Sequence, residues 1–511
     1  MPGNGLWRTK SIEQSIADTD EPGTKLRKEL TAWDLTVFGV AVVIGAGIFT
    51  LTASTAGNIA GPSVSLSFVL AAIACALAAL CYAEFASTVP VAGSAYTFSY
   101  ATFGEFAAWI IGWDLVLEFA VGSAAVAKGW SAYLQTTLGL MGLDVKTEVG
   151  DGIKFDWGAV LLVAVLTALL VVGTKLSSRV SAVITAIKVA VVLLVIVLGI
   201  SYIKAENYSP FIPPAAESGP AAHTGIEQSL FSLITGYSGS TYGVLGMLAA
   251  ASIVFFAFIG FDVVATTAEE TKNPQKAVPR GILGSLAIVT VLYVAVTLVI
   301  TGMVPYTKLA TQPDGTRATL ASAFADNGVD WAATVISVGA LAGLTTVVMV
   351  LMLGQSRVLF AMSRDGLLPR GLAKTGSHGT PTRITIIIGV LVAVAAGFFP
   401  AGKLEEMVNV GTLFAFILVS GGVLVLRKTR PDLSRGFRVP LVPLVPVLAI
   451  LACLWLMLNL TALTWVRFLI WMGLGVVVYF AYSRRNSVLG KTGESRVEPE
   501  PVVERGEEPG H

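Results

Sequence analysis

Segments of about 20 mostly apolar residues recur along the chain, and this recurrence limits what it can fold into. A helix needs roughly 20 such residues to cross the hydrocarbon core of a bilayer. Charged residues make up only 13% of the 511, against about a quarter in soluble proteins. The sequence therefore predicts an all-α integral membrane protein with about twelve transmembrane helices. The candidates are residues 33–56, 62–88, 98–137, 157–174, 177–203, 245–268, 279–304, 331–360, 383–400, 404–426, 442–460 and 464–483.

The distribution of basic residues predicts the orientation of these helices. An even number of helices places both termini on one side of the membrane. With the termini inside, the cytoplasmic segments hold 25 of the 34 Lys and Arg residues, and the outer segments hold seven. An excess of Lys and Arg is typical of cytoplasmic loops. We therefore expect a multi-pass protein of the cell (plasma) membrane with both termini in the cytoplasm.

Two of the apolar segments are interrupted by glycine at matching places. The first contains VIGAGIF at residues 43–49, and the sixth contains FAFIGFD at residues 256–262. The two segments are five helices apart, and because five is odd, a repeat of helices 1–5 onto 6–10 must be inverted across the membrane. Such interruptions in both halves indicate the central site of a transporter. We expect a five-plus-five inverted repeat with discontinuous helices 1 and 6, plus two extra helices.

This reading divides the chain into six parts. We expect a cytoplasmic N-terminal segment at 1–32, a first five-helix repeat at 33–203, an extracellular loop at 204–244, a second repeat at 245–426, helices 11 and 12 at 427–486, and a cytoplasmic tail at 487–511. The tail is charged and rich in Glu and Pro, a composition typical of disorder. In the outer segment 305–330, residues 318–327 are predicted to form a short helix over the mouth.

The glycine interruptions predict a chemistry for the two breaks. A helix broken in lipid strands N–H and C=O groups at several kcal/mol each, so something else must satisfy them. A bound amino acid can, because its carboxylate accepts from free N–H groups at a helix start and its ammonium donates to free carbonyls. The alternative is that the glycines only allow close packing. The predicted binding residues at the breaks are Val43, Ile44, Gly45, Ala46, Gly47, Phe256, Ala257, Phe258, Ile259 and Gly260.

Lys188 is predicted to lie deep in the membrane. It stands about eleven residues past the cytoplasmic start of helix 5, roughly 16 Å in at the helical rise per residue. A charge at this depth is costly and usually functional. Burial favours the neutral amine, so we expect Lys188 to exchange a proton during transport. The alternative is a permanently paired structural lysine.

Three acidic residues are candidates for supporting roles. Asp114 and Glu118 are four residues apart on helix 3 and share one face. Glu118 falls near mid-depth, where it can meet a basic side chain, carry a proton or form a structural hydrogen bond. Asp262 directly follows the sixth-helix break, where it can cap the inner half-helix or pair with a cation; we favour the structural role.

Other chemistries find no support in the sequence. The three histidines fall in loops and the tail, so neither a metal site nor a catalytic triad is predicted. No Gly-rich phosphate loop ending in Lys-Ser/Thr is present, and the three cysteines lie within apolar runs. We therefore expect no enzyme activity, no cofactor and no nucleic acid partner.

Six stretches together resemble a known family. They are residues 43–50, 82–100, 112–118, 255–274, 275–281 and 437–443. On these stretches the chain is similar to the cationic amino acid transporter family, bacterial type, of the amino acid–polyamine–organocation superfamily. The resemblance implies substrate held at the breaks of helices 1 and 6. It also implies that the Lys188 ammonium replaces a sodium ion of sodium-coupled relatives, that Glu118 lies near the substrate side chain, and that Phe256 is an aromatic gate.

These observations predict a secondary active permease for L-amino acids that works by alternating access, with H⁺ as the coupling ion. A proton-independent exchanger and a non-transporting sensor are the alternatives. Arginine and lysine, small neutral residues or a broad mixture remain open as substrates. Besides substrate and the lipid bilayer, a small accessory membrane subunit remains open as a partner.

Overall fold

The computed structural model describes residues 30–88, 94–143, 145–150, 154–172, 178–215, 225–236, 241–311, 317–373 and 381–492. Within them, eight helical spans are long and apolar enough to cross a membrane, and three shorter apolar helices join them. The first span, Ala32–Thr88, contains two of the predicted segments. The prediction of about twelve helices is therefore confirmed for the described part of the chain.

The first half runs from the first apolar segment to the fifth. Its elements are α2 (Ala32–Val43), η2 (Gly47–Leu51), α3 (Thr52–Thr55), η3 (Ala56–Ala60), η4 (Gly61–Ser63), α4 (Val64–Thr88), α5 (Ser94–Thr102), α6 (Glu105–Leu140), the antiparallel strands β1 (Glu148–Val149) and β2 (Phe155–Asp156), α7 (Trp157–Val172) and α8 (Ser178–Gly199).

The second half follows a loop of short helical turns. Its elements are η5 (Ile200–Tyr202), η6 (Ala205–Tyr208), η7 (Gly225–Glu227), α9 (Leu230–Thr235), α10 (Gly243–Val254), η8 (Phe255–Phe258), η9 (Phe261–Glu270), α11 (Pro274–Met303), η10 (Tyr306–Leu309), α12 (Leu320–Ala325), α13 (Asp330–Arg364), η11 (Arg370–Ala373), α14 (Thr382–Phe398), α15 (Ala401–Thr429), α16 (Leu444–Leu458), α17 (Ala462–Val478), η12 (Tyr479–Ser483), α18 (Arg484–Asn486) and α19 (Val488–Thr492).

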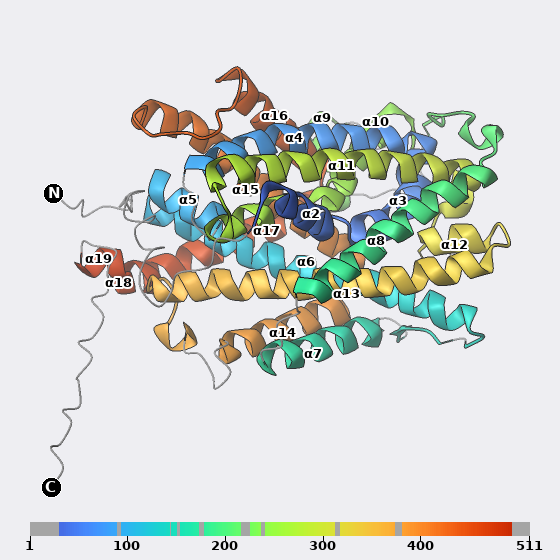
Figure 1. Cartoon of the computed structure of the whole chain (residues 1–511), viewed down its shortest axis with the longest axis horizontal. Coiled ribbons are helices and arrows are strands. Elements are labelled where there is room, and N and C mark those ends of the chain that lie inside the picture. The colour runs from blue at the N-terminus through green and yellow to red at the C-terminus, as the bar shows by residue number, and fades with distance from the viewer. Residues whose placement is uncertain are drawn as a thin grey trace, which may run out of the picture.

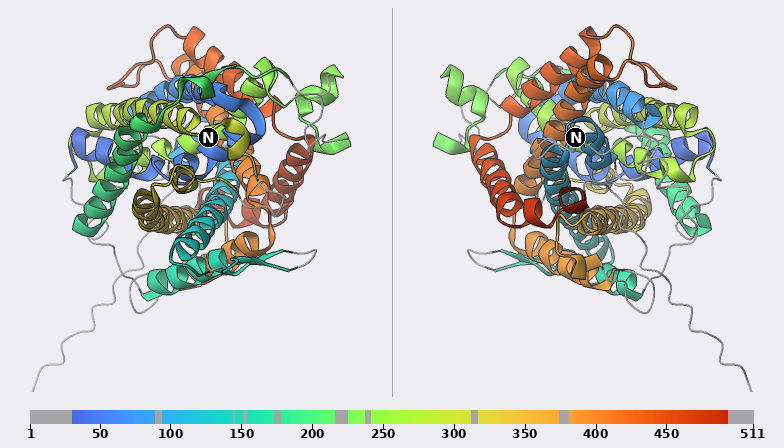
Figure 2. Two further views of the ribbon diagram at one scale, coloured as in Figure 1. Left: turned by 90° about the vertical axis from the view of Figure 1, so that its right-hand side faces the viewer. Right: turned by 90° about the vertical axis from the view of Figure 1, so that its left-hand side faces the viewer.

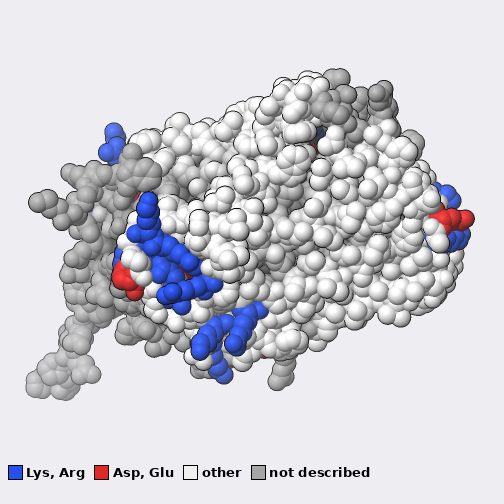
Figure 3. Space-filling view, turned by 90° about the horizontal axis from the view of Figure 1, so that it is seen from above, with Lys and Arg blue, Asp and Glu red and all other residues white. Residues whose placement is uncertain are grey.

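The helices form one elongated bundle with two ends. Figure 1 shows α5, α18 and α19 at one end, which we call the terminal face, and α12 at the other, which we call the loop face. Between them, the surface seen in Figure 3 is a broad band with almost no charged side chains, as a lipid-facing belt requires. Basic side chains gather towards the terminal face in the same view.

Helix packing shows the predicted repeat. Helix α4 packs against α11, α6 against α13, and α7 against α14, and each pair joins segments five apart in the series. Figure 2 shows α7 and α14 together at one side of the bundle. The contact of α2 with α11 has its counterpart in α10 with α4, and that of α6 with α15 in α13 with α8. An exchange of the two halves therefore preserves the neighbours.

Two predicted boundaries are wrong. The expected helix at 98–137 is two helices, α5 and α6, because Gly104 between them adopts φ 93°, which glycine tolerates and other residues rarely adopt. The tail predicted to be disordered from residue 487 begins with an ordered helix, α19. The buried Ser487 hydroxyl donates to the Glu105 carboxylate and accepts from the N–H of Gly490, which anchors α19.

Other parts of the predicted organisation have mixed outcomes. The short helix expected within residues 318–327 is present as α12. Residues 1–29 of the N-terminal segment and 493–511 of the tail lie outside the described residues.

A charge network on the terminal face joins the end of α15 to α4. Glu84, 3% exposed, accepts from Arg427 Nε at 2.9 Å and Nη2 at 2.6 Å, and from the N–H of Val439 at 2.7 Å. Arg435 Nε lies 3.4 Å from the same carboxylate. The carboxylate therefore neutralises two guanidinium groups on the terminal face.

We expect Glu84→Gln to lower the thermal stability of the protein in detergent. The substitution leaves the buried Arg435 side chain without its counter-charge, and breaking such a pair costs about 3 kcal/mol. The control is Asp432→Asn, which removes the partner of Arg430 in an exposed pair on the same face. It should leave the melting temperature unchanged, and equal shifts for both variants would contradict the assignment.

Candidate substrate site at the helix breaks

The first transmembrane segment is broken where the sequence predicts it. Helix α2 ends at Val43, and Ile44 leaves the helix with φ −68° and ψ 94°. The chain becomes helical again at Ala46 and continues as the π-helical turn η2. The N–H groups that begin a helix have no partner within it, so the N–H groups of residues 45–47 belong to the break.

The sixth segment is broken as well. Helix α10 gives way to the 3₁₀ turn η8, Ile259 is extended with ψ 136°, and Gly260 has φ 119°. Only glycine adopts this φ without strain. The chain then resumes as the 3₁₀ helix η9. The prediction of discontinuous helices 1 and 6 is therefore confirmed.

The two breaks lie against each other. A Cβ atom added to Gly47 would overlap the Cα of Ala257, and one added to Gly260 would lie 2.8 Å from Cγ1 of Val42. Glycine at position 47 therefore lets the two main chains meet, and glycine at position 260 leaves room for the Val42 side chain. All ten predicted residues at the breaks gather here; nine are buried, and Ile259 is half-buried.

Val347 of α13 closes the break of the first segment from another side. A Cβ atom added to Gly45 would lie 3.2 Å from Cγ2 of Val347. Phe256, in η8, is 7% exposed. Both α13 and η8 therefore place an apolar side chain, Val347 and Phe256, beside the breaks.

Tyr293 of α11 connects the two breaks, and the sequence reasoning missed it. Its hydroxyl lies 2.7 Å from the carbonyl oxygen of Val43 and 2.9 Å from that of Ala257. Having one hydrogen, it can donate to only one of the two at a time. Tyr293 is fully buried. A tyrosine in the middle of an apolar helix is a usable signal, since its buried hydroxyl needs a partner.

Tyr133 of α6 plays a similar part on the half-helix that follows the first break, residues 46–60. Its hydroxyl donates to the carbonyl oxygen of Phe49 at 2.7 Å. Within the same turn, Thr50 donates to the carbonyl oxygen of Ala46 at 2.6 Å. Both bonds satisfy carbonyls where the π-helical turn departs from the regular helical pattern.

Lys188 reaches the first break from α8. Its Nζ donates to the carbonyl oxygen of Ala41 at 2.9 Å, and the residue is 2% exposed. Its aliphatic stem packs on α13, where a Cβ atom added to Gly343 would lie 3.0 Å from the Lys188 Cγ. Lys188 therefore joins α8 and α13 to the last turn of α2. It forms no ion pair with any described acidic residue.

The three predicted acidic residues lie together but away from Lys188. The Glu118 carboxyl lies within hydrogen-bonding reach of Thr412 on α15 and within Coulombic range of Asp262. The Asp262 carboxyl lies against the backbone N–H groups at its own break. The predicted pairing of Glu118 or Asp262 with a basic residue does not occur among the described residues.

Asp114 is the most fully buried member of this group. A Cβ atom added to Gly411 of α15 would lie 2.9 Å from Asp114 Oδ1. Both Asp114 oxygens and Oδ1 of Asp262 lack a hydrogen-bond partner within the part of the chain that the structure describes. Buried oxygens without partners are costly unless they are protonated or take part in function.

A cavity of about 1250 Å³ opens at the loop face and reaches Thr50, in the half-helix that follows the first break. Lys128, on its wall, pairs with Glu148 at 2.6 Å and Asp156 at 3.1 Å, which holds the β1–β2 hairpin against α6. Across the cavity, Arg317 pairs with Glu405 at 2.9 Å. The cavity is a polar vestibule that leads towards the first break.

The half-helix that follows the first break is also hydrogen-bonded to the loop after α11. Asn58 and Thr311 exchange two hydrogen bonds, each of 3.0 Å. Gly57 allows this contact, because a Cβ atom there would overlap the backbone of Leu309 and Ala310.

Comparison with known proteins decides the family. Residues 30–481 match the amino acid permease family. The chain belongs to the amino acid permease family. The permease is a membrane transporter, and the resemblance found in its motifs is confirmed.

Relatives of the permease carry different substrates by name. It is 43% identical to the methylthioribose transporter of Bacillus subtilis, over 96% of this chain and all of the relative. It is 44% identical to the branched-chain amino acid permease BcaP of the same organism, over 95% of this chain and 99% of the relative. It is 38% identical to the vacuolar cationic amino acid transporter 4 of Arabidopsis thaliana, over 84% of this chain and 68% of the relative.

We expect Tyr293→Phe to reduce substrate uptake by the permease more than it reduces the stability of the fold. The change removes the hydroxyl that contacts both the Val43 and the Ala257 carbonyls, and one buried hydrogen bond is worth about 1 kcal/mol. Substrate uptake by reconstituted protein should fall, whereas the melting temperature should change by a few degrees at most. Unaltered uptake would show that the bridge has no part in transport.

Proposed function

We propose that the permease carries L-amino acids across the cell membrane by alternating access, in symport with protons. The observation that carries the proposal is the direct contact of two broken helices at Gly47 and Ala257. Contacting breaks from the two halves of an inverted repeat present unpaired main-chain groups near the middle of a bilayer, where a transporter binds its substrate.

The main-chain groups of the breaks bind the α-carboxylate and the α-ammonium, which all amino acids share. The N–H groups of residues 45–47 start a helix and attract the α-carboxylate. The carbonyls of Val43 and Ala257 accept from the α-ammonium. Each carbonyl oxygen has two lone pairs, so the single hydrogen of Tyr293 leaves capacity for a substrate.

Lys188 couples a proton to the movement of α2. A protonated amine binds the Ala41 carbonyl more strongly than a neutral amine does, since charge-assisted hydrogen bonds are roughly twice as strong. Loss of the proton therefore loosens the last turn of α2 from α8 and α13. Glu118 and Asp262 supply a second place for a proton, because two nearby carboxylates in an apolar interior resist ionising together.

The substrate range is broad and includes branched-chain and cationic amino acids. Val347 and Phe256 offer apolar surface near the breaks, and Glu118 offers a carboxylate to a basic side chain. The names of the relatives support both classes, one being a branched-chain amino acid permease and another a cationic amino acid transporter.

The terminal face lies in the cytoplasm in this proposal. Basic side chains gather towards it in Figure 3, and the positive-inside rule assigns such a face to the cytoplasm. The vestibule with Lys128 and Arg317 then opens outward and admits substrate.

Exchange without a coupling ion is the second candidate. The hydrogen bond of Lys188 to the Ala41 carbonyl also fits a lysine with a purely structural role. In that case, Lys188 would hold α2 in place without exchanging a proton.

Reconstitution of the full chain into lipid vesicles separates these functions. Thermal-shift measurements against the twenty amino acids identify ligands, and uptake of those ligands is then measured with an acidic exterior. We expect accumulation that a protonophore abolishes. Uptake that requires internal amino acid and ignores the pH gradient would establish the exchanger, and binding without uptake would establish a sensor.

A further inference from the structure

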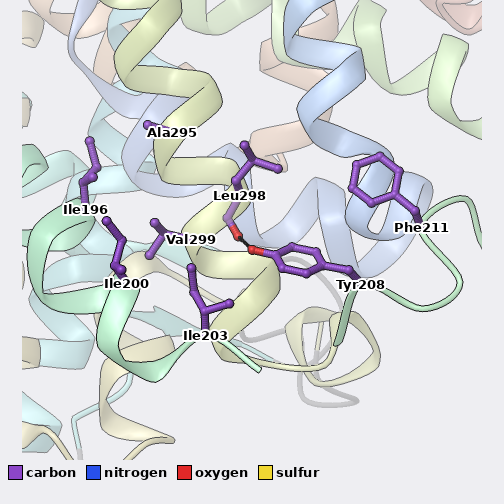
Figure 4. Close-up of a pocket in the computed structure, with 8 residues that line it drawn as sticks. All are labelled: Ile196, Ile200, Ile203, Tyr208, Phe211, Ala295, Leu298 and Val299. Carbon is purple, nitrogen blue, oxygen red and sulfur yellow. Dashed lines mark hydrogen bonds between the residues drawn. The ribbon is translucent and has the colours of Figure 1, made fainter. Parts of the chain in front are cut away.

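A groove of about 610 Å³ lies on the outside of the bundle, between α8 and α11 near the loop face. Figure 4 shows its lining. Ile196, Ile200 and Ile203 line it from α8 and the turn that follows, and Leu298 and Val299 line it from α11. Tyr208 and Phe211, in the loop after α8, close one end.

The shape of the groove is fixed by the protein. The two helices pack closely at Gly199, where an added Cβ atom would overlap Val299. The Tyr208 hydroxyl donates to the Leu298 carbonyl at 2.6 Å, and Asn207 donates to the Gly302 carbonyl at 2.6 Å. The loop that closes the groove is therefore tied to α11 and needs no ligand to hold it.

The chemistry of the groove admits only an apolar ligand. Its lining side chains are hydrocarbon apart from the Tyr208 hydroxyl, whose hydrogen is already used by the Leu298 carbonyl. A polar molecule placed there would lose hydrogen bonds to water without replacement.

The groove continues a surface that faces lipid. On α8, Val197 is 70% exposed, and on α11, Val291 is 69% exposed. Both belong to helical spans that are apolar enough to cross a membrane. Tyr208 and Phe211 sit at the end of the groove nearest the loop, and aromatic rings gather where hydrocarbon meets headgroups.

We propose that this groove holds one acyl chain of a phospholipid from the adjoining leaflet. The bound chain packs against α8 and α11 together and stabilises their present arrangement. Lys188 lies eight residues before Ile196 on α8, and Tyr293 lies five residues before Leu298 on α11. These two side chains bind the Ala41 and Val43 carbonyls at the first break. The groove thus lies beside both helices that hold the end of α2.

The site predicts that filling the groove removes the lipid. Ala295, a further lining residue on α11, is replaced by phenylalanine in the full chain. Val291→Phe is the matched control, because it lies one turn away on the same helix, faces lipid and does not line the groove. Native mass spectrometry after mild delipidation counts the phospholipids that each protein retains.

We expect wild type and Val291→Phe to retain one phospholipid, and Ala295→Phe to retain it with about tenfold lower occupancy, equivalent to 1.4 kcal/mol. Added phospholipid should raise the melting temperature of the first two proteins and leave that of Ala295→Phe unchanged. Ala295→Leu fills less of the groove and should lose less lipid, which keeps the test readable if the phenylalanine variant unfolds.

Two results would overturn the proposal. One is equal phospholipid retention by wild type and by whichever filled variant folds. The other is retention of detergent alone in every protein, with no phospholipid bound. Neither result depends on the coupling ion or the amino acid carried, so the proposed transport function is tested separately.

Discussion

Lys188→Ala is expected to abolish accumulation of amino acid driven by a pH gradient. The substitution removes the group that we propose to exchange a proton at the end of α2, and it leaves the Ala41 carbonyl without the donor that Lys188 supplies. An unsatisfied buried carbonyl costs about 1–3 kcal/mol, so some loss of stability should accompany the loss of coupling. Uptake into vesicles with an acidic exterior measures the first effect, and thermal melting measures the second.

Two further variants distinguish a proton-coupling role of Lys188 from a structural one. Lys188→Arg keeps a positive charge that proteins do not deprotonate, so it should bind substrate but fail to accumulate it. Full rescue by arginine would assign Lys188 a structural role and favour the exchanger. Lys204→Ala removes an exposed lysine beyond the end of α8 and should leave accumulation unaltered.

Gly47→Ala is expected to eliminate transport. The new methyl group would occupy the position of the Ala257 main chain, and a backbone atom cannot rotate away as a side chain can. Separation of the two breaks would remove the shared site, and overpacking of this kind costs about 1–3 kcal/mol in stability. Uptake should therefore be lost together with a measurable fall in melting temperature.

Gly122→Ala supplies the matched control for that experiment. Gly122 lies on α6, and its added Cβ would meet only Leu351 and Val408 side chains at 3.6 Å or more. This is ordinary contact, so Gly122→Ala should fold and transport normally. If Gly47→Ala also transported normally, the contact between the breaks would not be the substrate site.

The features that follow from length, apolarity and backbone chemistry were predictable from the sequence. The apolar segments predicted the helices, and glycine at residues 45, 47 and 260 predicted the two breaks. Lys188 was identified because a charged residue deep in a membrane helix is energetically costly and usually functional. Each of these inferences depends on local sequence and on the bilayer as solvent.

Contacts between distant segments were not predictable in the same way. The bridge from Tyr293 to Val43 and Ala257 depends on how α11 packs across both breaks, which no local pattern encodes. The division of the third segment at Gly104 was hidden because apolar and aromatic residues continue on both sides of it. The order of α19 depends on a carboxylate, Glu105, that lies 382 positions away from Ser487 along the chain.

The anchoring of α19 also determines where the carboxyl end of the protein can be altered. Glu105 begins α6 and is fully buried, and it accepts from Tyr100 and Tyr479 as well as from Ser487. Truncation ahead of Ser487 would remove one hydrogen-bond donor of the buried Glu105 carboxylate. It would also expose this carboxylate to water at the start of α6, the longest described helix. An affinity tag or fluorescent fusion therefore belongs after Thr492, the last residue of α19.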